Sequence, residues 1–182
     1  MKNQNTKNLV TAAVCLALCL VLPFLTGQIP QIGNALSPMH FPVLLAGFLC
    51  GPWWAAAAGA IAPLLRFFLF HSPALYPTGI AMCFELATYG LISGLLYQRL
   101  SKRPVNIYVS LIAAMLAGRV VWGVARVILS GVSGELFTWE MFMAGAFLKA
   151  IPGIAVQIVL VPLLVMALKR AGFFERTVPL PA

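Results

Sequence analysis

Long apolar runs separated by short polar stretches dominate this chain. Six apolar segments can be delimited, and they cover residues 9–25, 39–50, 53–70, 77–97, 105–130 and 141–168. A membrane-spanning helix needs about 20 mostly apolar residues to cross a hydrocarbon core of about 30 Å. The pattern therefore predicts an all-α integral membrane protein with six transmembrane helices, folded as a single membrane domain over residues 1–182.

Turn-forming residues separate the predicted helices. Gly51-Pro52 lies between the second and third segments, a stretch with two prolines at 71–77 precedes the fourth, and Arg103-Pro104 precedes the fifth. The second segment is short for a complete crossing. Two explanations are open: its helix begins in the connection before it, or it tilts little and is surrounded by protein rather than lipid.

The composition supports a membrane protein and leaves little polar surface. Of 182 residues, 62% are hydrophobic and 9% are charged, and the mean hydropathy is +0.97. A soluble domain usually carries about a quarter charged residues. We therefore expect a chain embedded in the lipid bilayer, with no appended soluble domain.

The basic residues outside the apolar segments all fall on one side of a six-helix arrangement. They precede the first segment or follow the fourth and the sixth: Lys2, Lys7, Arg99, Lys102, Arg103, Lys169, Arg170 and Arg176. The opposite connections, 26–38, 71–76 and 131–140, contain no Lys or Arg. By the positive-inside rule, this asymmetry places both termini in the cytoplasm of a multi-pass cell-membrane protein. The net charge of +8 then reports topology, not nucleic-acid binding.

The first segment and the cysteines indicate neither processing nor redox chemistry. The first segment has a basic start but no small-x-small cleavage pattern before Gly27, so we expect a retained helix rather than a signal peptide. The four cysteines lie within or at the ends of apolar segments without CxxC spacing: Cys15, Cys19, Cys50 and Cys83. We interpret them as structural thiols.

Five charged residues interrupt the apolar segments: Arg66, Glu85, Arg119, Arg126 and Lys149. A charge near the bilayer centre costs about 2.5–3.5 kcal/mol on insertion scales, so such residues normally face a protein interior or a wet cavity. Four cations against one anion favour a substrate with a carboxylate or phosphate group, because Arg binds such oxygens bidentately. A structural alternative is open: Glu85 pairs with Arg119 or Lys149 to assemble the bundle, while Arg66 and Arg126 reach the lipid headgroups.

Helical spacing groups other side chains with these charges. Three sets share a helix face: Glu85 with Tyr89, Arg119 with Trp122 and Arg126, and Lys149 with Gln157. The connection 26–38 mixes Gly, Pro and amide residues with apolar ones, as expected of a lid that packs over a ligand. We therefore predict a site open to the outside, walled by the third to sixth helices. Its candidate substrate-binding residues are Asn34, His40, Arg66, Tyr76, Glu85, Tyr89, Arg119, Trp122, Arg126, Lys149 and Gln157.

No pattern of a catalytic or metal site is found in the sequence. The two histidines are far apart along the chain, Glu85 has no acidic partner within the segments, and there is no GxSxG elbow or P-loop. We therefore expect a protein that is not an enzyme and that holds no metal or cofactor. A nucleotide-binding fold has neither room nor motif here, so ATP-driven transport would need another subunit.

Three runs of the chain carry a resemblance to a known family. They are SPMHFPVLLAGFLCGP at 37–52, YPTGIAM at 76–82 and FELATYG at 84–90. These runs resemble the substrate-binding S components of energy-coupling factor (ECF) vitamin transporters, as do the chain size, the six helices, the cytoplasmic termini and the lid-like first outer loop. The resemblance implies a subunit that binds a vitamin or vitamin precursor from outside. It also implies docking onto a transmembrane coupling subunit that carries two ATPases.

The same resemblance suggests a docking face on the first helix. Family members carry an Ala-xxx-Ala motif there that packs against the coupling subunit, and Ala13 and Ala17 fit this pattern. Small residues four apart allow close helix approach. The substrate is open: the surplus of cations favours an anion such as pantothenate, whereas Glu85 would suit a pyridoxine-, thiamine- or queuosine-like compound.

Two other classes are also open. A self-sufficient secondary transporter of a small anionic or zwitterionic metabolite would show internal repeats or broken helices around a midplane site, and no repeat relates residues 1–90 to 91–182. A membrane scaffold subunit without a ligand would tolerate replacement of Arg66, Arg126 or Lys149 without losing uptake.

Overall fold

The structure is a computed structural model that describes residues 2–25, 36–101, 103–134 and 136–173. Within these ranges the chain is helical and contains no strand. The elements are α1 (Lys2–Leu25), α3 (His40–Cys50), α4 (Pro52–Phe70), the π-helical turn η1 (Leu75–Gly79), α5 (Ile80–Arg99), α6 (Pro104–Ser133), α7 (Trp139–Ala146), the 3₁₀ turn η2 (Leu148–Ala150) and α8 (Ile151–Arg170).

Five helical stretches in the described ranges are long and apolar enough to cross a membrane. They are Gln4–Phe24, Pro52–Phe70, Leu75–Arg99, Pro104–Val132 and Trp139–Arg170. The prediction of an all-α membrane fold is thereby confirmed, and the six-helix count and the side of the termini stay predictions. The remaining apolar helix, α3, has 11 residues and spans only about 17 Å at 1.5 Å per residue. Its residues from Pro42 to Cys50 are all buried, as expected for a short helix surrounded by protein.

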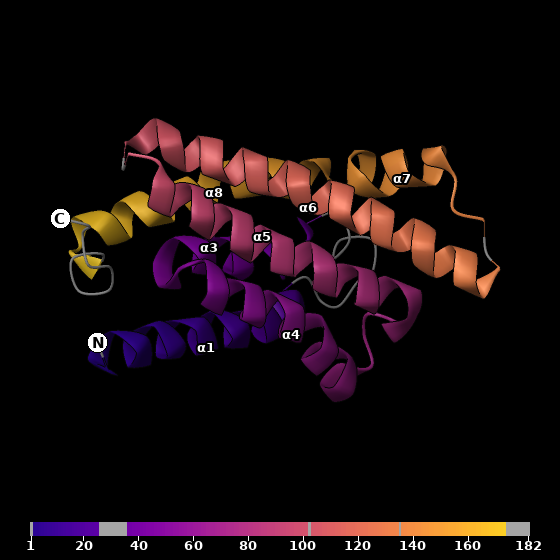
Figure 1. Cartoon of the computed structure of the whole chain (residues 1–182), viewed down its shortest axis with the longest axis horizontal. Helices are drawn as coiled ribbons and strands as arrows, with labels where there is room; N and C mark the ends of the chain where they lie inside the picture. The colour runs from indigo at the N-terminus through magenta and orange to yellow at the C-terminus, as the bar shows by residue number, and fades with distance from the viewer. Residues whose placement is uncertain (1, 26–35, 102, 135, 174–182) are drawn as a thin grey trace.

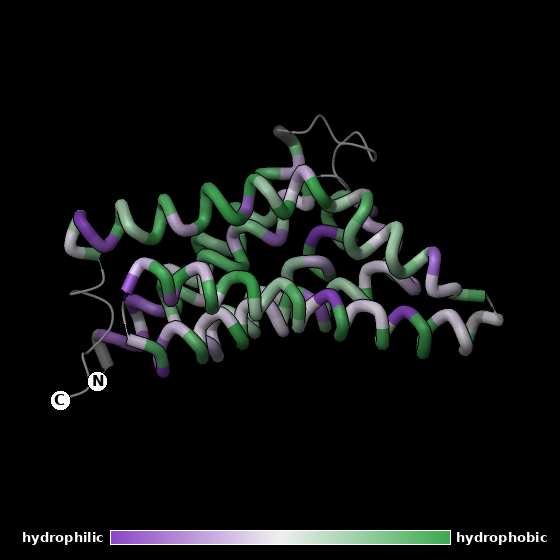
Figure 2. The backbone as a smooth tube through the Cα atoms, turned by 90° about the horizontal axis from the view of Figure 1, so that it is seen from above, coloured by the Kyte–Doolittle hydropathy of each residue, from purple (hydrophilic) through white to green (hydrophobic). Residues whose placement is uncertain are grey.

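The long helices form an antiparallel bundle. Helices α1, α4 and α6 run in one direction and α5 and α8 in the other, so α1 begins and α8 ends at the same end of the molecule (Figure 1). We call this the terminal end, and the opposite end, where α4 finishes and α7 begins, the distal end. Figure 2 shows that hydrophilic residues gather at the terminal end. Lys7, Arg99, Arg103 and Lys169 all lie near helix ends there.

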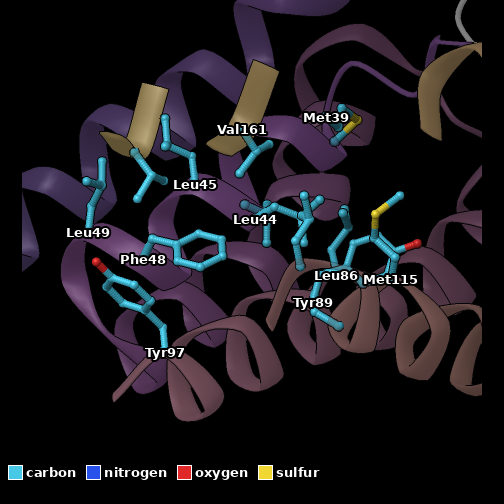
Figure 3. Packing of buried hydrophobic residues seen from close by; sticks show 14 of the residues in the cluster. Met39, Leu44, Leu45, Phe48, Leu49, Leu86, Tyr89, Tyr97, Met115 and Val161 are labelled. Carbon is cyan, nitrogen blue, oxygen red and sulfur yellow. The ribbon is translucent and has the colours of Figure 1, made fainter. Parts of the chain in front are cut away.

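The buried core is built around α3. This helix packs against α1, α4, α5 and α8. The main core cluster includes side chains of α3, α5, α6 and α8 (Figure 3): Leu44 and Phe48 of α3, Leu86 and Tyr89 of α5, Met115 of α6 and Val161 of α8. Cys19 of α1 and Ala62 of α4 also belong to it. Lipid is as apolar as these side chains, so close packing rather than escape from water holds the helices together.

Glycines allow α4 and α5 to approach each other closely. A Cβ added at Gly90 would lie 2.5 Å from the carbonyl carbon of Ala55, and one at Gly94 would lie 2.7 Å from the Cα of Pro52. Such distances are shorter than van der Waals contact, so any larger residue at either position would push the two helices apart. Helices α3, α4 and α5 therefore form a tight unit that positions the polar residues described below.

The last predicted segment is divided rather than continuous. Helix α7 ends at Ala146, and Phe147 has φ −123° and ψ −64°, outside helical geometry. Pro152 at the start of α8 has no backbone N–H, and its ring would clash with the carbonyl four residues earlier in an uninterrupted helix. At the other end of the chain, α1 begins at Lys2, seven residues before the predicted apolar segment.

Candidate functional site

A buried carboxylate on α5 is the centre of the polar interactions inside the bundle. Glu85 is 1% exposed. Its Oε1 accepts a hydrogen bond of 3.0 Å from the Tyr89 hydroxyl and lies 2.9 Å from Nη1 of Arg119. Nε2 of His40 lies 3.3 Å from the same oxygen, although it is not directed as a hydrogen bond. This one carboxylate thus links α3, α5 and α6.

Gln157 of α8 lies at a similar position along the bundle axis to His40, Glu85 and Arg119. Each of four polar residues is four positions from a member of the core cluster: His40 from Leu44, Glu85 from Tyr89, Arg119 from Met115 and Gln157 from Val161. Residues four apart on a helix lie one above the other, and the order of the helices puts each polar residue on the distal side. Each therefore lies one turn distal to its partner among Leu44, Tyr89, Met115 and Val161, which are labelled in Figure 3. We call His40, Glu85, Arg119 and Gln157 the polar layer.

The depth of the polar layer is about half the length of the longest helix. Glu85, Arg119 and Gln157 lie about 20–22 Å from the terminal ends of their helices at 1.5 Å per residue. All four members of the layer are buried, with exposed fractions from 1% to 7%. Burial of charge at such a depth is costly unless it is paired, and the contact between Glu85 and Arg119 provides that pairing.

Arg126 belongs to a second group, two turns further toward the distal end on the same face of α6. Its Nη1 donates a hydrogen bond of 3.1 Å to Oγ1 of Thr78 in η1, and its guanidinium lies 5.3 Å from the ring centroid of Phe137. The Tyr76 hydroxyl donates to the carbonyl of Leu129. The turn η1 is therefore attached to α6 at two points.

Trp122 occupies the face of α6 between the two arginines. Its ring centroid lies 5.9 Å from that of Phe137 and 6.3 Å from that of Phe142, with which it is stacked. A Cβ added at Gly145 of α7 would lie 2.9 Å from the indole ring, so this glycine makes room for Trp122. The packing attaches the short helix α7 to α6 through aromatic rings.

Arg66 lies apart from the polar layer. It is 5% exposed, and its Nη1 donates a hydrogen bond of 3.0 Å to the carbonyl of Leu20 in α1. Its guanidinium lies 5.6 Å from the ring centroids of both Phe24 and Phe70. Within the described ranges, Arg66 thus joins α4 to α1, and no polar contact connects it with Glu85.

The predicted site residues thus divide into four sets. The structure brings His40, Glu85, Tyr89 and Arg119 into contact, with Gln157 at the same level. Trp122, Arg126 and Tyr76 lie distally, and Arg66 lies against α1. Asn34 and most of the connection 26–38 fall outside the described residues, and for Lys149 only the backbone, in η2, is described.

The two alanines predicted to dock a partner lie on an exposed face of α1. Ala13 and Ala17 are both exposed, one turn apart and one above the other. Exposed apolar side chains surround them: Val10, Val14, Leu18 and Val21. The opposite face of α1 is buried through Ala12, Cys15 and Cys19.

Thr78, Phe137 and Phe142 belong to this region but are not indicated by the sequence. Thr78 meets Arg126 across 48 positions, and no local pattern connects the two. Aromatic residues are frequent between 137 and 147, which is the only signal that these rings form a group. The described residues contain no group of three or more His, Cys, Asp or Glu side chains that could hold a metal ion.

Comparisons with known proteins identify the family. The family model described as "ECF transporter, substrate-specific component" matches residues 7–165. No curated protein and no solved structure matches the chain. The family match covers most of α1 and all four residues of the polar layer. The chain therefore belongs to the substrate-specific components of ECF transporters, which are membrane-embedded transport subunits and not enzymes.

Proposed function

We propose that this protein binds a vitamin or vitamin precursor from outside the cell, as the substrate-specific subunit of an ATP-driven uptake transporter. The polar layer is the observation that carries the proposal. Four polar or charged side chains from four helices lie buried about half-way along a bundle whose core is mostly apolar. Burial of ionisable residues at such depth costs stability, so their presence there typically indicates a substrate pathway or another functional site.

The polar layer and the distal group supply different contacts for a substrate. His40, Arg119 and Gln157 offer ring, guanidinium and amide nitrogens deep in the bundle. Trp122 offers an aromatic surface nearer the distal end, and Arg126 a cation. Tyr76 belongs to the proposed site on the distal side, and Asn34 and Lys149 stay predicted members of the site. The contacts of Arg66 with α1 support a structural role for that residue.

The proposed direction of binding follows from charge. Lys7, Arg99, Arg103 and Lys169 lie at the terminal end, where Figure 2 shows hydrophilic residues. By the positive-inside rule this end is the cytoplasmic one. The distal end, in whose half of α6 Arg126 lies, would then face outside. A substrate would enter from that side.

Coupling to ATP would require other subunits. The chain has no nucleotide-binding motif, so the proposed energy source is a membrane coupling subunit with two ATPases. The exposed face of α1 around Ala13 and Ala17 supports docking there. Small residues on that face would let a partner helix approach closely.

A binding experiment tests the proposal directly. Mass spectrometry of small molecules that copurify with the detergent-solubilised protein would be compared between wild type and Arg126→Ala, with Ser110→Ala as a control on the same helix. We expect one vitamin-sized species with wild type and the control, and its loss or depletion with Arg126→Ala. No retained species, together with no thermal stabilisation by any compound of a vitamin panel, would contradict the proposal.

One observation favours a self-sufficient secondary transporter as the second candidate. The helix broken between α7 and α8 lies next to the proposed site, and broken helices at substrate sites are typical of such transporters. Purified protein alone in liposomes distinguishes the two. Uptake driven by an ion gradient without other subunits would favour the second candidate, and binding without uptake the first.

A further inference from the structure

Two hydrogen-bond donors of the polar layer have no partner in the described structure. Nε of Arg119 and Nε2 of Gln157 are buried and make no hydrogen bond, and their residues are 7% and 2% exposed. A buried donor without a partner costs about 1–3 kcal/mol, so native structures contain few of them. Both donors belong to helices that pack against each other, α6 and α8. Together they would suit a group with acceptor atoms placed between these helices.

His40 adds a third nitrogen to the layer. Neither of its ring nitrogens makes a hydrogen bond in the described structure, and Nε2 faces the Glu85 carboxylate at 3.3 Å. A neutral imidazole carries one N–H and one lone pair. With the proton on Nε2, toward the carboxylate, Nδ1 would accept a hydrogen bond. The layer thus offers two donors and one acceptor.

The charges of the polar layer decide which kind of acceptor fits. Glu85 and Arg119 lie 2.9 Å apart and together carry no net charge. A carboxylate bound to Nε of Arg119 would add a second anion beside Glu85, and like charges repel strongly in a low-dielectric interior. An uncharged acceptor, such as the carbonyl of an amide, lactam or urea group, avoids this repulsion.

Arg126, unlike Arg119, has no carboxylate among its described contacts. Its partners in the described ranges, Thr78 and Phe137, carry no charge, and its Nε is buried without a hydrogen bond. It lies seven residues from Arg119 on the same helix face, which is about 10 Å along the axis. Trp122 lies between them. Among the proposed site residues whose side chains the structure describes, Arg126 is therefore a cation that is available for an acidic group.

Resting on the proposed function, we infer that the substrate carries an uncharged amide-, lactam- or urea-like head that binds in the polar layer, and an acidic group about 10 Å away that binds Arg126. The head accepts from Arg119 and Gln157 and donates to His40. The part between the two groups lies along Trp122. Glu85 acts as a positioning residue, since it holds Nη1 of Arg119 and leaves Nε for the head.

Matched pairs of probes, in which only the acidic group differs, test this inference. Wild-type protein in nanodiscs would be titrated calorimetrically with biotin and biotinamide and with pantothenate and panthenol, and then with thiamine and pyridoxine, which have no acid. The variants are Gln157→Leu, which keeps the volume but removes the donor, and Arg126→Gln. Ser110→Ala is the control, because Ser110 is also buried without a hydrogen bond but lies about 13 Å further toward the terminal end. Gel filtration and melting temperature verify that each variant folds.

We expect one acidic probe to bind, with two separable effects. Gln157→Leu should weaken the acid and its neutral partner equally, by about tenfold, as expected for one lost hydrogen bond in a buried site. Arg126→Gln should weaken the acid by at least about tenfold and the neutral partner by less than about twofold. Ser110→Ala should change neither by more than about twofold.

Other results separate the inference from the proposed function. If Gln157→Leu weakens only the acidic member, the acid lies in the polar layer and the inference is overturned. It is also overturned if only thiamine or pyridoxine binds, or if Gln157→Leu has no effect. In each of these cases the protein still binds a vitamin, so the proposed function stands. If no probe binds to wild-type protein, no vitamin-sized species copurifies with it and no compound of the vitamin panel stabilises it, the proposed function itself fails.

Discussion

Nη1 of Arg119 lies 2.9 Å from Oε1 of Glu85 and joins α6 to α5 in the middle of the bundle. The same carboxylate accepts from Tyr89 and faces His40, so three helices meet at one oxygen. The pair therefore has a structural role, as one reading of the sequence expected. It does not exclude a role in binding, because the pair also orients the unpartnered Nε of Arg119.

Replacing Glu85 by Gln should destabilise the protein strongly. The change leaves Arg119 as a buried charge without a counter-charge, which typically costs about 3–5 kcal/mol. The melting temperature in detergent should therefore fall well below that of wild type. The double variant Glu85→Gln/Arg119→Gln should lose less than the sum of its two single variants, since no unpaired charge is left. Additive losses would show that the two side chains do not interact.

Gly90 should tolerate no side chain. A Cβ there would lie 2.5 Å from the carbonyl carbon of Ala55, so Gly90→Ala forces α4 and α5 apart and should cost about 1–3 kcal/mol of unfolding free energy. Gly131 on α6 is the matched control, because no atom lies within 4 Å of its added Cβ. Gly131→Ala should be neutral or stabilising by up to about 1 kcal/mol. Equal melting temperatures for the two variants would contradict the close packing of α4 on α5.

The sequence predicts the helices of this fold well, because apolar length and turn residues are local signals. The ends of the apolar segments at Leu25, Cys50 and Phe70 coincide with the ends of α1, α3 and α4. The break between α7 and α8 was missed, although Pro152 provides a physical reason for it. Hydropathy alone does not register a break within a continuous apolar run.

The site was predictable only in part. Helical spacing places Glu85 with Tyr89 on one face, and the structure confirms this pair by a hydrogen bond. It could not single out Arg119 as the partner of Glu85, because that contact depends on how α5 packs against α6. Arg66 shows the same limit: its partner is the backbone carbonyl of Leu20, and carbonyls have no sequence signature.

Arg66→Leu should affect stability rather than substrate affinity. The guanidinium bonds to Leu20 and lies over the rings of Phe24 and Phe70, so its removal weakens the attachment of α4 to α1. We expect a lower melting temperature, with a dissociation constant for a bound vitamin within about threefold of wild type, which corresponds to less than about 0.7 kcal/mol. Calorimetric titration of the folded variant measures the affinity. A loss of affinity of more than about tenfold, with an unchanged melting temperature, would show that Arg66 contributes to substrate binding.

Bulky residues on the exposed face of α1 should abolish transport but not binding. Ala13 and Ala17 are exposed and stacked one turn apart, so Ala13→Trp or Ala17→Trp would keep a partner helix from approaching closely. Neither alanine lies in the polar layer, so vitamin binding by the isolated subunit should stay within about twofold of wild type. Val120→Trp is the control, because Val120 is 59% exposed on α6, away from the proposed docking face. Copurification with the coupling subunit and its ATPases, together with ATP-dependent uptake in cells, measures docking. If Val120→Trp blocks uptake as strongly as the alanine variants, a general effect of surface bulk explains the loss, and the docking face on α1 is refuted.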